Sequence, residues 1–271
     1  MRNLLVSLSA AVLATACAGG SSGPTFEYGP SSTPLRYQVS SKTESVIETP
    51  MGVQNANDTA NVTVTLQIGE LAGDGRQVTA IFEEFSSQIT GVGSLEGGAM
   101  LGQEFSGILA HDGTIEFTET PSIPKKLSDY IDPAAFLSEF LVPMPPPGSE
   151  TVETWPVSQE YTEHTQMTMT TTVEGTARIV GDTVWNGQPA KLIEIRADYT
   201  LEGTGMPTGT PAELEMVLSG PGTIRAVWDA QRGVLLSAMS HGNATGTVSL
   251  VGMDITMAVT AESWTSIVLK N

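Results

Sequence analysis

Apolar and polar residues alternate with a period of two along most of this chain from residue 35 onward. Such alternation is typical of β-strands that bury one face and expose the other. The clearest runs are residues 62–68, 161–173, 193–201 and 251–259. Turn signals separate the runs at Gly73-Asp74-Gly75, Asp112-Gly113, Asn186-Gly187 and Arg232-Gly233. Because such turns join antiparallel strands, the pattern predicts a mainly β protein.

One segment departs from this period. Asp132 is a favourable N-cap, Pro133 suits the first helical turn, and the apolar residues that follow recur at helical spacing. A short amphipathic helix is therefore predicted over residues 133–141, closed by the proline-rich residues 143–147. We expect this helix to cover an open side of the first half of the protein.

Strands of similar order flank the predicted helix, which divides the body into residues 34–148 and residues 149–271. Residues 105–115 and 223–235 look like equivalent hairpins. Their likeness is one of pattern rather than identity, and it suggests a duplication of about 110 residues. We therefore predict antiparallel β-structure built from two similar halves with one short helix. Whether the halves share one extended, curved sheet or form two packed sheets, a sandwich, stays open.

The N-terminus has the features of an export signal. Arg2 provides a positive charge, residues 4–13 form an uncharged apolar run, and three small residues lead into Cys17. The run is too short to span a bilayer and ends in a small-residue cleavage site, so residues 1–16 are interpreted as a signal peptide. Residues 17–33 are rich in Gly, Ser and Pro, which favours a flexible tether.

The small residues Ala14, Thr15 and Ala16 before Cys17 resemble the lipobox of bacterial lipoproteins, although Ala14 stands where leucine is commoner. The resemblance implies that Cys17 is lipidated with two or three acyl chains, which hold a protein firmly on a membrane. Ala18 rather than aspartate follows the cysteine, which implies the outer membrane, facing the periplasm, if the host is Gram-negative. The alternative is an ordinary secreted protein that is cleaved nearby.

The chain is strongly acidic, with 30 Asp and Glu residues against 12 Lys and Arg residues and a net charge of −18. Loss of the signal removes Arg2 and no acid, so the mature charge is about −19. This charge argues against nucleic acid as a partner, because its phosphates would be repelled, and against docking on anionic lipid headgroups. Cys17 is the only cysteine, so a lipidated chain has no disulfide.

The familiar catalytic motifs are missing from the sequence, which has no Gly-x-Ser-x-Gly elbow, no paired Cys and His nucleophile and no His-Glu-x-x-His. The only histidines are His111, His164 and His241, and none has the spacing of a metal site. No catalytic residue, metal or cofactor is therefore predicted. An enzyme stays the competing interpretation, which requires these histidines to gather with carboxylates in one cleft.

Several predicted strand faces carry methionines, whose adaptable thioethers fill gaps in a core or accept ligands. Long strands with a helix resemble, in architecture alone, the half-barrels of LolA, LolB and LprG-type envelope proteins. That resemblance implies acyl chains held between sheet and helices. The chain more closely resembles a group of uncharacterised bacterial lipoproteins, whose two β-rich halves are joined by a Pro-rich segment containing Trp, here residues 140–155. That group has no established activity to carry over.

The sequence therefore predicts a non-catalytic, lipid-anchored envelope protein that binds an apolar ligand, such as a lipid, or an envelope partner protein. Its contact with the membrane is the acyl anchor on Cys17. The residues expected to bind an apolar ligand lie on the helix and the strands: Phe136, Leu137, Phe140, Leu141, Met167, Met169, Ile193 and Ile195. The alternative is a structural or interaction protein whose halves close on each other and leave no cavity.

Overall fold

The computed structural model describes residues 26–146 and 152–270. Within these ranges the chain forms one antiparallel sheet of 12 strands, so the mainly β prediction is confirmed. The strands are β1 (Leu35–Thr49), β2 (Gly52–Ala72), β3 (Gly75–Ile89), β4 (Gly93–Glu96), β5 (Glu104–Ala110), β6 (Ile115–Glu119), β7 (Thr154–His164), β8 (Met167–Trp185), β9 (Gln188–Gly205), β10 (Leu214–Asp229), β11 (Val234–Leu250) and β12 (Ile255–Lys270). The helices are η1 (Gly98–Met100), α1 (Lys125–Ser128) and α2 (Pro133–Ser138).

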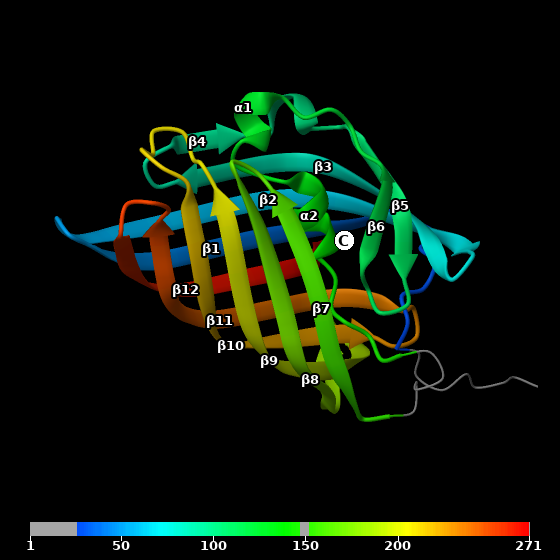
Figure 1. Ribbon diagram of the computed structural model, residues 1–271. Helices are drawn as coiled ribbons and strands as arrows, with labels where there is room; N and C mark the ends of the chain where they lie inside the picture. The colour runs from blue at the N-terminus through cyan, green and yellow to red at the C-terminus, as the bar shows by residue number, and fades with distance from the viewer. Residues whose placement is uncertain (1–25, 147–151, 271) are drawn as a thin grey trace, which may run out of the picture.

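The sheet is an up-and-down meander, because most strands lie beside their neighbours in sequence. Its order is β6-β5-β3-β2-β1-β12-β11-β10-β9-β8-β7, and β4 pairs with β3. Strands β1 and β12 pair from Arg36↔Lys270 to Glu48↔Ala258, so the first and last strands meet in the middle. The result is one extended, curved sheet that is open between β6 and β7 (Figure 1), and not two packed sheets.

The two segments predicted as equivalent hairpins are indeed hairpins, β5–β6 and β10–β11. The β5–β6 hairpin forms a free edge of the sheet, whereas β10–β11 lies inside it, between β9 and β12. The two hairpins therefore take different positions in the sheet, and the duplication stays a prediction. The expected boundary at residues 148–149 lies outside the described residues.

The helix predicted over residues 133–141 is observed as the shorter α2, with Asp132 as its N-cap and Glu139 as its C-cap. Residues 140–142 are consecutive and all buried. An amphipathic helix buries one stripe and cannot bury three residues in a row on that stripe, so the chain leaves the helix there. The short helix α1 precedes α2 and was not predicted.

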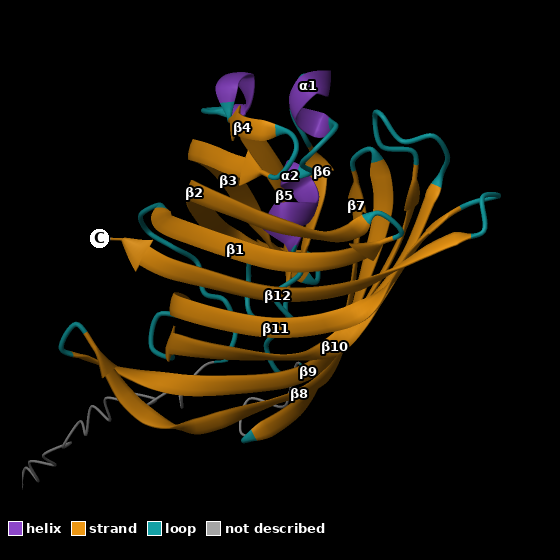
Figure 2. Cartoon of the chain, turned by 90° about the vertical axis from the view of Figure 1, so that its left-hand side faces the viewer, coloured by secondary structure: helices purple, strands orange, loops and turns teal. Residues whose placement is uncertain are grey.

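Helix α2 lies on the concave side of the sheet, where it contacts β6 and β7 (Figure 2). It covers the opening between the two free edges, and so belongs to both halves rather than to the first half alone. The protein core includes large, almost fully buried aromatic side chains: Phe26, Tyr28, Tyr37, Phe82, Phe105, Trp155 and Trp228.

Residues 26–28 pack on this core, although they belong to the segment 17–33 that was expected to form a flexible tether. Phe26 and Tyr28 are 1% and 2% exposed. The Tyr28 hydroxyl donates to the Val142 carbonyl oxygen at 3.1 Å and accepts from the Val142 amide at 2.9 Å. Two aromatic side chains bury a large apolar area, so they hold this segment in place. The predicted signal peptide and Cys17 lie outside the described residues and stay predictions.

Candidate functional site

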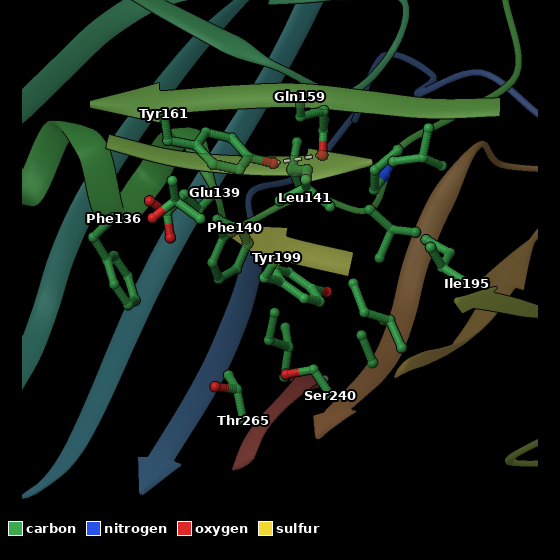
Figure 3. Close-up of a pocket in the computed structure, with 18 of the residues that line it drawn as sticks. Phe136, Glu139, Phe140, Leu141, Gln159, Tyr161, Ile195, Tyr199, Ser240 and Thr265 are labelled. Carbon is green, nitrogen blue, oxygen red and sulfur yellow. Dashed lines mark hydrogen bonds between the residues drawn. The ribbon is translucent and has the colours of Figure 1, made fainter. Parts of the chain in front are cut away.

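A cavity of about 360 Å³ lies between the concave face of the sheet and the segment formed by α2 and the residues after it. Its volume falls within the ~300–1,000 Å³ typical of small-molecule sites. Strands β1 and β7 to β12 supply one wall, and side chains from residues 136–143 supply the other (Figure 3). We call this space the α2 cavity.

The strand wall of the α2 cavity is mostly apolar because the period-two alternation turns apolar side chains inward. Each of the seven strands contributes one aliphatic side chain: Val39, Val157, Val173, Ile195, Ile224, Ala238 and Ile267. These strands come from both ends of the sequence and become neighbours only through the β1–β12 pairing. The cavity therefore exists only in the complete meander.

Hydrogen bonds at both ends of α2 fix the helix between the free edges of the sheet. At its start, the Asp132 carboxylate accepts from two first-turn amides at 3.1 Å and from the amide of His164, the last residue of β7, at 3.0 Å. At its end, the Ser138 hydroxyl donates to the carbonyl oxygen of Ile115 in β6 at 2.9 Å. The helix that closes the cavity is thus tied to β6 and to β7.

Aromatic contacts hold α2 and the residue that follows its C-cap against the strands. The rings of Phe140 and Tyr37 meet edge to face with centroids 5.1 Å apart, and those of Phe136 and Phe82 are 5.9 Å apart. A smaller cavity of about 130 Å³ adjoins the α2 cavity, and Ser41 and Phe136 line both spaces. The Phe136 ring therefore lies between two apolar spaces under the same helix.

Polar groups interrupt the apolar wall at a few positions. The Tyr161 hydroxyl donates to Oε1 of Gln159 at 2.5 Å, and both side chains project from β7 (Figure 3). Tyr199 of β9 adds a second phenol. Burial raises the pKa of Tyr161 and of Tyr199, so both hydroxyls are neutral at physiological pH and offer hydrogen bonds without charge.

Glu139 brings a carboxyl group to this wall. Burial raises the pKa of Glu139 to about 7, and the nearby carboxylates of Glu163 and Asp132 add to the shift. Glu139 is exposed as a residue and its side chain borders the cavity, so water reaches the carboxyl group. It forms no hydrogen bond or ion pair with any residue in the described ranges. Burial, followed by repulsion from Asp132, also raises the pKa of Glu163, whereas the Asp132 amide lowers it.

The residues predicted to bind a ligand are only partly brought together. Those that line the α2 cavity are Phe136, Phe140, Leu141 and Ile195. Leu137 and Ile193 are fully buried in the core instead. Met167 and Met169 lie beside the β7–β8 turn, where they pack against Gly203. Ligand binding by any of these residues stays a prediction.

Glu139, Tyr161 and Tyr199 were not predicted to be site residues. A signal for Glu139 was present, because it lies three residues after Phe136 and so falls on the same face of the predicted helix. A charged residue within an apolar stripe marks a position of interest. The tyrosines gave no such signal, since a Tyr at an inward strand position is ordinary core material.

The three histidines have separate surroundings. His241 approaches the Glu262 carboxylate at 2.8 Å and stacks on a tryptophan ring, His111 lies 4.0 Å from Glu27, and His164 ends β7. Residues 26–146 and 152–270 contain no group of three or more His, Cys, Asp or Glu side chains placed to hold a metal ion. In the same ranges, no helix is long and apolar enough to cross a membrane.

No protein-family model matches this chain, and no curated protein matches its sequence. Among solved structures it is similar to Pseudomonas aeruginosa OccK2 (OpdF) in complex with glucuronate, with a TM-score of 0.30, 6% identity and coverage of 90% of this chain and 100% of that chain. A domain from Vibrio parahaemolyticus described as an outer membrane lipoprotein-sorting protein gives a TM-score of 0.15 and 10% identity over 86% of this chain and 83% of that chain. A DUF1329 family protein from Desulfovibrio piger gives a TM-score of 0.14 and 8% identity over 86% of this chain and 84% of that chain. TM-scores this low carry no argument about fold or function.

Proposed function

We propose that this protein binds the apolar chain of a lipid-like ligand in the α2 cavity and does not transform it. The observation that carries the proposal is the cavity itself, with a volume of about 360 Å³ and a wall that is apolar over most of its area. A few polar groups, Glu139 and Tyr161 among them, interrupt that wall. Ligand sites in proteins have this composition, because apolar surface supplies affinity and a few polar groups fix orientation.

The short length of α2 supports the same proposal. Its six residues span about 9 Å at a rise of 1.5 Å per residue. Strand β11 alone has 17 residues, which span about 56 Å at 3.3 Å per residue. An apolar sheet face must be covered by a helix, by a second sheet or by a ligand. Since α2 covers only part of this face, the partly buried Ile224 and Ile267 leave apolar surface in the cavity that is available to a ligand chain.

The proposal places the protein at the cell envelope, held by acyl chains on Cys17. The order of positive charge, apolar run, small residues and lone cysteine supports this location. Cys17→Ser should release the protein from the membrane fraction into the soluble fraction. The anchor proposal fails if the wild-type protein is already soluble after fractionation, or if the variant stays with the membranes.

Ligand binding is tested on the protein purified from its own host. Extraction with organic solvent removes non-covalently held lipid and leaves covalently attached acyl chains on the protein. Mass spectrometry of the extract should then detect an aliphatic compound in an amount comparable to that of the protein. A clean extract, together with native mass spectra of the bare chain alone, would leave only a structural or partner-binding role.

A matched pair of variants on β8 locates the ligand. Val173 lines the α2 cavity, whereas Val180 on the same strand is 49% exposed. Val173→Trp should fill the cavity and abolish co-purification of the aliphatic compound, while Val180→Trp should retain it. Circular dichroism should show the same strand signal for both variants. Equal amounts of lipid on both would place the ligand outside the α2 cavity.

A further inference from the structure

The charge of the α2 cavity is one-sided. Among the described residues that line it, Glu139 is the only one with a group that ionises near neutral pH, and no Lys, Arg or His side chain borders the space. Glu163 lines the adjoining small cavity together with Asp132. A ligand under α2 therefore meets carboxylates and neutral hydroxyls but no positive charge.

The Glu139 carboxyl group has no partner in the described part of the chain. Water solvates this exposed carboxylate in the empty cavity, and a ligand that displaced the water without offering a donor would leave it without a hydrogen bond. The C-cap position fixes Glu139 at the end of α2, where its side chain borders the cavity. A cationic donor in the cavity would supply the missing partner.

We infer that the α2 cavity takes an amphiphile whose head carries a protonated amine, with the amine paired to Glu139 and the aliphatic chain on the apolar strand wall. This inference rests on the proposed function, since it names the head group of the same ligand. An ammonium group has three donors. Besides the carboxylate, Oε1 of Gln159 and the hydroxyl oxygen of Tyr199 are acceptors that line the same cavity.

The same geometry disfavours an anionic head group. A fatty-acid carboxylate in this position would lie near Glu139, with Glu163 and Asp132 behind it, and no cationic side chain of the cavity wall would offset the repulsion. An uncharged alcohol could enter, because it needs only the apolar wall and a neutral hydrogen bond. The expected order of affinity is amine, then alcohol, then carboxylate.

The affinity for the amine should depend on pH in a defined direction. The groups that face Glu139 are Asp132 at the other end of α2, Tyr161 and Glu163 on β7, and Tyr199 on β9. The pKa of Glu139 in the empty cavity is about 7. A protonated amine binds best to the ionised carboxylate, so amine binding below that pH must release the proton of Glu139. Amine affinity should rise from about pH 6 to about pH 8 and then level off, whereas alcohol affinity should stay flat.

The test compares decylamine, decanol and decanoate, which share one chain and differ in head group. The full chain carrying Cys17→Ser is used, so that neither covalent acyl chains nor detergent compete for the cavity. Competition against a fluorescent apolar probe at physiological salt, which screens the surface charges, gives the three affinities. Decylamine should bind at pH 8 about tenfold more tightly than decanol. A charge-assisted hydrogen bond is stronger than a neutral one, and the difference in free energy corresponds to about a tenfold difference in affinity.

Two variants separate the head group from the chain. Glu139→Gln should lower decylamine affinity about tenfold, to the level of decanol, while decanol binding stays unchanged and shows that the cavity is intact. The control Glu160→Gln removes an exposed carboxylate on β7, the strand that α2 contacts. It should leave the affinities for all three compounds unchanged. Decanoate binding as tightly as decylamine, or an unaltered decylamine affinity in Glu139→Gln, overturns the amine inference and leaves the apolar-chain proposal standing. Failure of all three compounds to bind overturns both.

Discussion

Replacing Asp132 with Ala should loosen α2 over its cavity without unfolding the sheet. The Asp132 carboxylate accepts two hydrogen bonds from the first turn of α2 at 3.1 Å and one from the His164 amide of β7 at 3.0 Å. Alanine removes all three at once. The helix then loses its N-cap together with its link to one edge of the sheet.

The size of this effect follows from the bonds lost. An N-cap is worth about 1 kcal/mol, and the bond to the His164 amide is worth about 1 kcal/mol, so local opening of α2 becomes easier by about 2 kcal/mol. Because 1.4 kcal/mol is a factor of ten, the α2 amide hydrogens should exchange up to about 30-fold faster. Loss of the Asp132 charge also relieves repulsion on Glu139 and Glu163, which offsets part of the loss.

Hydrogen exchange followed by mass spectrometry measures this opening on peptides from α2, with peptides from β11 as the internal reference. Asp132→Asn is the matched control, because Asn caps a helix about as well as Asp but has only one acceptor oxygen. It should keep the cap and lose the bond to His164, and so give about fivefold faster exchange. Wild-type exchange rates in Asp132→Ala, or equal rates in the two variants, would refute the reasoning.

Glu139→Gln should stabilise the protein at pH 8 and leave its stability unchanged near pH 4. Since the pKa of Glu139 rises in the fold from 4.5 to about 7, the folded state holds the proton more tightly than the unfolded chain. The wild-type protein therefore loses stability as the pH rises from 4.5 to about 7. Urea unfolding of the wild type and of Glu139→Gln at pH 4 and pH 8 measures this loss. Equal unfolding midpoints for the two proteins at pH 8 would contradict the prediction. Tyr28→Phe should cost about 2 kcal/mol, because Val142 loses a partner for both its amide and its carbonyl oxygen. Tyr37→Phe, which removes one hydrogen bond to the Leu235 carbonyl oxygen, should cost about 1 kcal/mol of stability. Urea unfolding midpoints compare the two variants, and a larger loss in Tyr37→Phe than in Tyr28→Phe would contradict these hydrogen-bond roles.

Local alternation placed strands but not all of their ends, because it is a property of neighbouring residues. The run predicted over residues 161–173 crosses the turn between β7 and β8, and the run over residues 251–259 begins in the turn before β12. The long runs around Val62 and Ile195 are strands, and Asp132 caps a helix. The pairing of β1 with β12 could not be predicted, since it joins Arg36 to Lys270 and no local pattern specifies a partner so far away. That single pairing decides between one curved sheet and two packed sheets.

The site was harder to predict because burial depends on distant neighbours. Phe136 and Phe140 were recognised from their helical spacing, and both line the cavity. Ile193 and Ile195 share one strand face, yet only Ile195 reaches the cavity, while Ile193 is covered by the core. Likewise, Phe26 lies in a segment whose Gly, Ser and Pro content favours a tether, and its burial depends on the core that the later strands build.

Photo-crosslinking tests most directly whether an apolar chain lies in the α2 cavity. A decyl amine with a diazirine at the chain end is added to the full chain carrying Cys17→Ser, irradiated, and mapped by peptide mass spectrometry. Adducts should fall on residues 136–143 and on the inward positions of β9 and β12 near Ile195 and Ile267, and Val173→Trp should abolish them. Adducts confined to exposed positions such as Val180, or an unchanged pattern in Val173→Trp, would contradict a ligand in this cavity.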